Sequence, residues 1–198
     1  AGMPYINASG EHYNVKTLKY FISDITLHSS DSNTILLKDM HFVDAQDPST
    51  LDFISQELNN GSYSAISYIM GITNSMNIDN IYLNEDFHDD MVWPITMGGG
   101  YHYMRLEGSF DNDIIVDNYN THTGPTIGMD HSFPNQSSVS INVTDIIGNI
   151  SLDINMAINN WYQDPNTITI TENGIMGNMQ TQMNLMQNGI QNVFSVNQ

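Results

Sequence analysis

The sequence contains no cysteine in its 198 residues. This absence excludes disulfide bonds, zinc sites built on thiolates, and cysteine nucleophiles. It also leaves imidazole nitrogen and thioether sulfur as the soft ligands that remain for a transition metal. A chain without oxidisable thiols fits a protein that works outside the cytoplasm.

Basic side chains are scarce as well. Four Lys and Arg residues stand against 22 Asp and Glu residues, which gives a formal net charge of -18 at pH 7. Such a surface repels nucleic-acid phosphates and anionic lipids, so we expect neither nucleic-acid binding nor electrostatic docking to membranes. It attracts cations, which suits metal capture and equally suits a soluble protein in salty surroundings.

Long apolar runs are missing too. No stretch approaches the roughly 18 apolar residues that a membrane helix needs, so we expect no membrane insertion. The sequence begins at Ala1-Gly2 without an initiator methionine or the apolar core of a signal peptide. We therefore expect that a signal sequence has been removed and that the protein is periplasmic, cell-surface or secreted.

What the chain does contain is a series of short segments in which apolar and polar residues alternate with period two. This alternation is typical of half-buried strands, and Asp, Asn, Gly and Pro clusters separate the segments. We predict a mainly β fold, an antiparallel β-sandwich that forms a single domain over residues 1–198. The predicted strands are 13–27, 35–37 with 42–43, 63–72, 101–110, 114–122, 139–143, 150–158, 167–171 and 193–196.

One short helix is predicted near the C-terminus, because large apolar residues recur there at helical spacing. Methionines at such spacing are typical of core packing, and we prefer that interpretation to a track of thioether ligands for copper. The residues concerned are Met176, Met179, Met183, Met186 and Ile190.

The segment from Met91 to His131 concentrates side chains that bind transition metals. After the glycines Gly98–Gly100, the alternation places His102 on the mainly apolar face of a strand. The polar turn Asp111–Asp113 follows, and the next strand returns along the first. Such a hairpin brings His122 towards His102 at its open end.

Two imidazoles on neighbouring strands can reach one metal ion at about 2 Å each. We therefore predict a metal site with His102 and His122 as its core ligands and with His88 or His131 completing the shell. For each histidine taken alone, a hydrogen-bonded residue at a strand end is the alternative interpretation.

Other motifs argue against further chemistry. The acidic run Glu85–Asp90 lacks the ligand alternation and central glycine of an EF-hand loop, so we predict a solvated loop there. No P-loop lysine follows the glycines, and the sequence has neither a Gly-x-Ser-x-Gly elbow nor a His-Glu-x-x-His motif. We therefore expect that the protein is not an enzyme.

Ten short segments, in their order and spacing, carry a family resemblance over nearly the whole chain. They are residues 18–25, 42–45, 60–63, 70–72, 91–94, 100–108, 121–124, 159–162, 175–177 and 193–195. On these segments the chain resembles the MbnP-like family, extracytoplasmic β-rich proteins related to the copper-binding partner of the methanobactin system.

The resemblance implies that histidines bind copper, as Cu(I) or Cu(II). In some members a tryptophan, oxidised to kynurenine by a dihaem partner enzyme, assists them. By position Trp93 is the candidate for that oxidation, and His88 lies five residues before it. We interpret His12, His28 and His41 as structural or exposed.

Three functional classes follow, with the oligomeric state left open. The first is an extracytoplasmic copper-binding protein that acts in acquisition, buffering or delivery. The second is a structural or adhesive β-sandwich subunit of an extracellular assembly, in which the histidines are incidental. The third is a calcium-stabilised module that binds glycans or proteins through its Asp-rich loops.

Overall fold

The computed structural model describes residues 3–144, 149–171 and 174–198. The strands within these residues are β1 (Tyr5–Ile6), β2 (His12–Tyr13), β3 (Thr17–Ser29), β4 (Thr34–Asp44), β5 (Gly61–Met70), β6 (Met104–Asp111), β7 (Val116–Thr123), β8 (Phe133–Val143), β9 (Asp153–Met156) and β10 (Phe194–Asn197). The α-helices are α1 (His88–Met91) and α2 (Met179–Asn188). No helix in the described part of the chain is long and apolar enough to cross a membrane.

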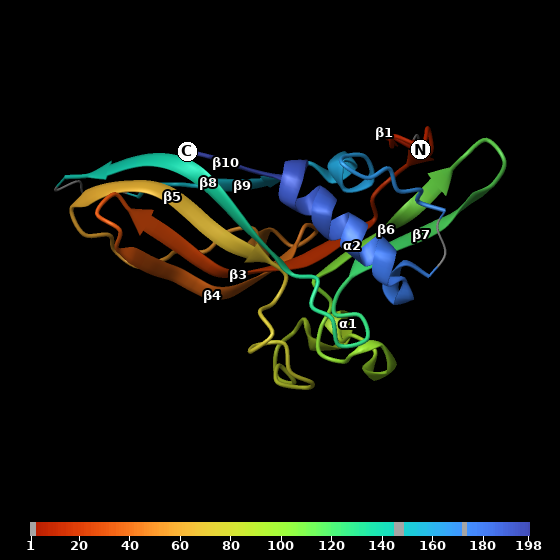
Figure 1. Ribbon diagram of the computed structural model, residues 1–198, viewed down its shortest axis with the longest axis horizontal. Coiled ribbons are helices and arrows are strands. Elements are labelled where there is room, and N and C mark those ends of the chain that lie inside the picture. Colours follow the sequence, from red (N-terminus) through yellow and green to blue (C-terminus); the bar gives the residue numbers. More distant parts are fainter. Residues whose placement is uncertain (1–2, 145–148, 172–173) are drawn as a thin grey trace.

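Eight strands form one antiparallel sheet built around the long strand β3. Along one side β3 pairs with β4, and along the other it pairs first with β6 and then with β5. The sheet therefore has two wings, with β8 beside β5 in one and β7 beside β6 in the other (Figure 1). Asp24 has a left-handed φ of 52°, and the β3–β4 register shifts between Ile25 and Thr26, which bends the strand.

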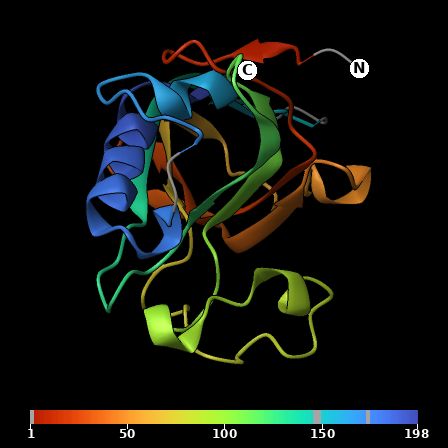
Figure 2. The ribbon, with the colours of Figure 1, turned by 90° about the vertical axis from the view of Figure 1, so that its right-hand side faces the viewer.

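The main core lies between this curled sheet and the C-terminal elements. Helix α2 and the small β9–β10 sheet lie over one face of the large sheet (Figures 1 and 2). Leu185 of α2 and the fully buried Trp161 pack in one apolar cluster with sheet residues such as Ile25. The Asn178 side chain accepts hydrogen bonds from the first turn of α2 and so caps the helix.

A second, smaller apolar cluster lies under the long connection between β5 and β6. This connection, residues 71–103, extends away from the sheet and carries α1 (Figure 1). The cluster anchors the connection, and its fully buried members are Phe21, Ile72, Met91, Tyr101 and Tyr103.

The architecture confirms the mainly β, antiparallel, sandwich-like fold with a short C-terminal helix. Three predicted strands were wrong in part or in whole. The predicted strand 13–27 is divided between β2 and β3, and residues 14–16 belong to neither. The predicted strand 150–158 shrinks to β9, because the chain turns at Ile158–Tyr162 to bury Trp161. Residues 167–171 form no strand, because the backbone N–H of Ile170 donates to the buried carboxylate of Glu11 instead of to a neighbouring strand. Helix α1 was not predicted.

Candidate metal centre

The return of the long connection to the sheet positions the first half of the site. Gly98, Gly99 and Gly100 have φ values of 126°, 72° and 79°, which only glycine adopts readily. An added Cβ at Gly99 or Gly100 would also collide with the side chains of Asp79 or Asn77. This turn folds the chain back so that the backbone N–H of His102 donates to Met91 O at 2.7 Å.

The β6–β7 hairpin positions the second half. His122 lies directly opposite Arg105, and the last pair of the ladder is Met104 with Thr123. His102 lies two residues before that pair, at the open end of the hairpin. The rings of His102 and His122 have centroids 4.9 Å apart and planes inclined at 84°. The structure thus brings together the two histidines that the hairpin argument singled out.

Each of the two rings has one nitrogen hydrogen-bonded and one free. Nδ1 of His102 donates to Met91 O at 3.1 Å, and Nε2 of His122 donates to Glu107 Oε1 at 2.7 Å. A carbonyl and a carboxylate only accept hydrogen bonds, so these nitrogens carry the protons. The other two nitrogens, Nε2 of His102 and Nδ1 of His122, are buried without a hydrogen-bond partner among the described residues. They hold lone pairs.

Burial keeps both rings neutral. Burial and, to a smaller extent, the neighbouring His122 lower the pKa of His102 to about 3. Burial also lowers the pKa of His122, although its hydrogen bond to Glu107 opposes the shift. Burial alone would raise the pKa of Glu107, but Arg105 and His122 lower it more, so the carboxylate is ionised. Neutral imidazole is the form that binds a metal ion.

Trp93 forms one wall of the histidine pair. Its side chain is fully buried, and its ring centroid lies 4.7 Å from that of His102 in an edge-to-face contact. Its Nε1 donates to Met97 O at 3.3 Å. Gly124 lies against the indole, where an added Cβ would come within 2.6 Å of Cε3.

Among the described residues, neither of the other two predicted ligands forms a group of three with this pair. Nδ1 of His88 forms a hydrogen bond with the Tyr101 hydroxyl at 2.9 Å. His131 is buried, and its Nε2 has no hydrogen-bond partner in the described structure. The described residues contain no group of three or more His, Asp or Glu side chains that could hold a metal ion. The structure therefore adds neither His88 nor His131 to the pair.

The remaining histidines have ordinary surroundings. Nε2 of His28 forms a hydrogen bond with the Ser67 hydroxyl at 2.7 Å, and His41 lies between Lys38 and the carbonyl of Thr50. His12 is exposed. These positions agree with a structural or exposed role.

Sequence reasoning missed two polar residues that support the site. Glu107 accepts from His122 as described above. Gln182, buried in α2, donates to His122 O at 2.7 Å and accepts from Gly124 N at 3.3 Å, so it holds the end of β7. No signal in the sequence pointed to Gln182, because the predicted stripe of methionines is only partly buried and its last member Ile190 is exposed. The face that α2 buries instead carries Thr181, Gln182, Leu185 and Asn188.

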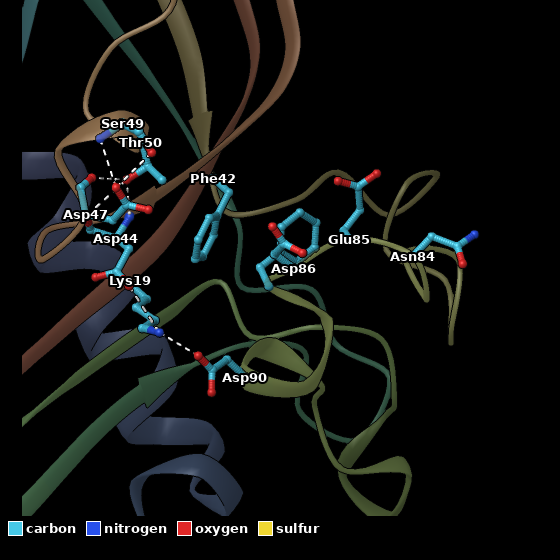
Figure 3. Close-up of a pocket in the computed structure, with 11 residues that line it drawn as sticks. Lys19, Phe42, Asp44, Asp47, Ser49, Thr50, Asn84, Glu85, Asp86 and Asp90 are labelled. Carbon is cyan, nitrogen blue, oxygen red and sulfur yellow. Dashed lines mark hydrogen bonds and ion pairs between the residues drawn. The ribbon is translucent and has the colours of Figure 1, made fainter.

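An acidic pocket lies elsewhere, between the β3–β4 pair and the connection that carries α1 (Figure 3). Lys19 projects into it, and its Nζ bonds Asp90 at 2.5 Å and Asp44 at 3.2 Å. Lys19 therefore neutralises part of the pocket's negative charge. The further lining residues are Phe42, Asp47, Ser49, Thr50, Asn84, Glu85, Asp86 and Phe87.

A curled antiparallel sheet with a buried histidine pair beside a tryptophan defines the class: a β-rich protein with a candidate metal centre. The MbnP family model matches residues 2–184, so the chain belongs to the MbnP family. Its fold is similar to the solved structure of MbnP from Methylosinus trichosporium, with a TM-score of 0.57 and 11% identity over 96% of this chain and 89% of that chain. Comparison with curated protein sequences gave no match.

Proposed function

We propose that this protein binds copper outside the cytoplasm, in acquisition, buffering or delivery, with His102 and His122 as its ligands. One observation carries the proposal. The two rings lie 4.9 Å apart, and each keeps a buried nitrogen lone pair without a partner. A buried acceptor without a donor costs about 1–3 kcal/mol. A metal ion that both nitrogens reach would satisfy the two lone pairs.

The chemistry of the donors supports copper. Imidazole suits copper and zinc, and Cu²⁺ binds a given nitrogen site more tightly than Zn²⁺ does. Membership of the MbnP family supports the same metal, since the family is related to the copper-binding partner of the methanobactin system. Two neutral imidazoles accept Cu(I) or Cu(II). We assign the protein a binding role and no catalysis.

Metal analysis of untreated protein, followed by diffraction at the copper absorption edge, tests this function. We expect bound copper and an anomalous peak between His102 and His122. Calcium at the acidic loops, without copper, would instead support the calcium-stabilised module. Metal-free protein that forms large particles in solution would support the assembly subunit.

We further propose that Trp93 is the residue that a dihaem partner enzyme converts to kynurenine. In that conversion the indole C2–C3 bond is cleaved as the oxidant adds two oxygen atoms, and water then releases C2 as formate. An aniline nitrogen and a ketone remain. The position supports the assignment, because the Trp93 ring lies 4.7 Å from that of His102, so the aniline nitrogen that remains from indole Nε1 would belong to a side chain next to the pair.

Peptide mass spectrometry across Met91–Arg105 checks the modification. We expect kynurenine in protein purified from its own source and intact tryptophan in protein made in a foreign host, which lacks the partner. An intact Trp93 in native protein that binds copper tightly would show that this chain functions without the modification.

A further inference from the structure

Glu107 lies where it can orient one of the two proposed ligands. In the β6–β7 ladder Arg105 faces His122 and Glu107 faces Asn120, so Glu107 is the diagonal neighbour of His122 on the same face. Side chains at diagonal positions of an antiparallel pair are within reach of each other. Glu107 Oε1 accepts from Nε2 of His122 at 2.7 Å.

The carboxylate is itself held in place. The same Oε1 accepts from Nε and Nη2 of Arg105, at 2.9 and 2.7 Å. Nη1 of Arg105 donates in turn to Asp90 O at 2.6 Å, which ties this network to α1. Three donors on one oxygen fix the position of Glu107 and keep it ionised.

This arrangement decides which nitrogen of His122 is free. A rotation of the ring about its Cβ–Cγ bond would break the Nε2 hydrogen bond and move Nδ1 away from its present position. While Glu107 holds Nε2–H, the buried Nδ1 is the nitrogen that keeps a lone pair. In His102 the other nitrogen carries the proton. Its Nδ1–H donates to the backbone carbonyl of Met91, which leaves Nε2 free.

We propose that Glu107 is a positioning residue that fixes the ring orientation and tautomer of His122, so that the centre binds its metal through Nδ1 of His122 and Nε2 of His102. The proposal rests on the proposed copper function of this pair. A carboxylate behind a ligating imidazole orients the ring and increases its basicity, and loss of such a partner typically costs about 10–100-fold in metal affinity.

Two variants separate the geometry from the charge. Glu107→Gln keeps an oxygen that can accept from Nε2–H but removes the charge, whereas Glu107→Leu removes both. In metal-free protein, ¹⁵N NMR of the histidine rings should show an exchange-protected Nε2–H on His122 for the wild type and for Glu107→Gln. We expect Glu107→Leu to lose that signal. Glu57→Leu, which removes the same charge from an exposed position, is the matched control.

Copper titration supplies the second readout. We expect Glu107→Leu to bind Cu(II) about 10–100-fold more weakly than the wild type, Glu107→Gln to lie between them, and Glu57→Leu to match the wild type. Unchanged affinity together with a retained Nε2–H in Glu107→Leu would overturn the proposal. So would a copper-bound wild-type structure with the metal on Nε2 of His122, a test that does not depend on how the variants fold. If the wild type binds no copper, the proposed function fails, and the NMR of metal-free protein still reports whether Glu107 positions the ring.

Discussion

Replacing His102 with leucine is expected to abolish tight copper binding while the metal-free protein stays folded. The variant removes one of the two free lone pairs, so the ion loses a whole ligand bond. The loss should exceed about 100-fold in affinity, the upper end of what a residue behind a ligand typically costs. Isothermal titration with copper measures it.

Unlike copper affinity, the stability of the metal-free protein should hardly change in His102→Leu. In the variant the Met91 carbonyl loses the hydrogen bond from the ring, but it still accepts one from the backbone N–H of residue 102. Leucine also removes a buried nitrogen that has no hydrogen-bond partner among the described residues. Chemical denaturation of metal-free His102→Leu should therefore give a free energy of unfolding close to that of the wild type.

Other histidines provide the controls. His12→Leu, at an exposed position, should leave the titration curve unchanged. His88→Leu and His131→Leu should weaken binding less than His102→Leu or His122→Leu does, because the structure places neither residue with the pair. Copper binding by His102→Leu at wild-type affinity would remove His102 from the site.

Hydrophobic periodicity was enough to predict the hairpin that carries His122 and follows His102. Alternation around His102, a polar turn and a returning strand are local features, and they bring His122 towards His102 through the pairing rules of an antiparallel ladder. The predicted strands 101–110 and 114–122 appear as β6 and β7 with shifted ends. In that register His122 shares a face with Arg105 and Glu107, opposite the face of Met104. The two rings therefore meet only because His102 lies before the start of β6, outside the regular ladder.

The rest depends on contacts between distant parts of the chain. Gln182 reaches β7 only because α2 packs over the large sheet, and helix periodicity does not say which side chain meets which strand. His88 and His131 lie near the pair in sequence, but among the described residues neither joins it in a group of three possible ligands, and Nδ1 of His88 bonds the Tyr101 hydroxyl. For residues 167–171 an apolar pattern was read as a strand, although buried Ile168 and Ile170 need no ladder once Glu11 satisfies the backbone.

The buried imidazoles should also lower the free energy of unfolding of the metal-free protein at acid pH. A histidine in the unfolded chain takes up a proton below about pH 6.5, whereas burial lowers the pKa of His102 in the folded protein to about 3. Between these values the unfolded state binds more protons, so stability falls as the pH falls through that window. Burial shifts the pKa values of His41, His122 and His131 in the same direction.

We therefore expect metal-free wild-type protein to lose about 3 kcal/mol of stability between pH 7.5 and pH 4.5 through His102 alone, at about 1.4 kcal/mol for each pH unit below 6.5. Urea denaturation at the two pH values measures the loss. Paired carboxylates also lose stability in acid, so the informative quantity is the difference between variants. His102→Leu should lose about 3 kcal/mol less than the wild type does, and His12→Leu should behave as the wild type. If the wild type and His102→Leu lost the same stability in acid, the prediction would be wrong. The His102 ring would then take up its proton as readily in the folded protein as in the unfolded chain, despite its burial against Trp93 and His122.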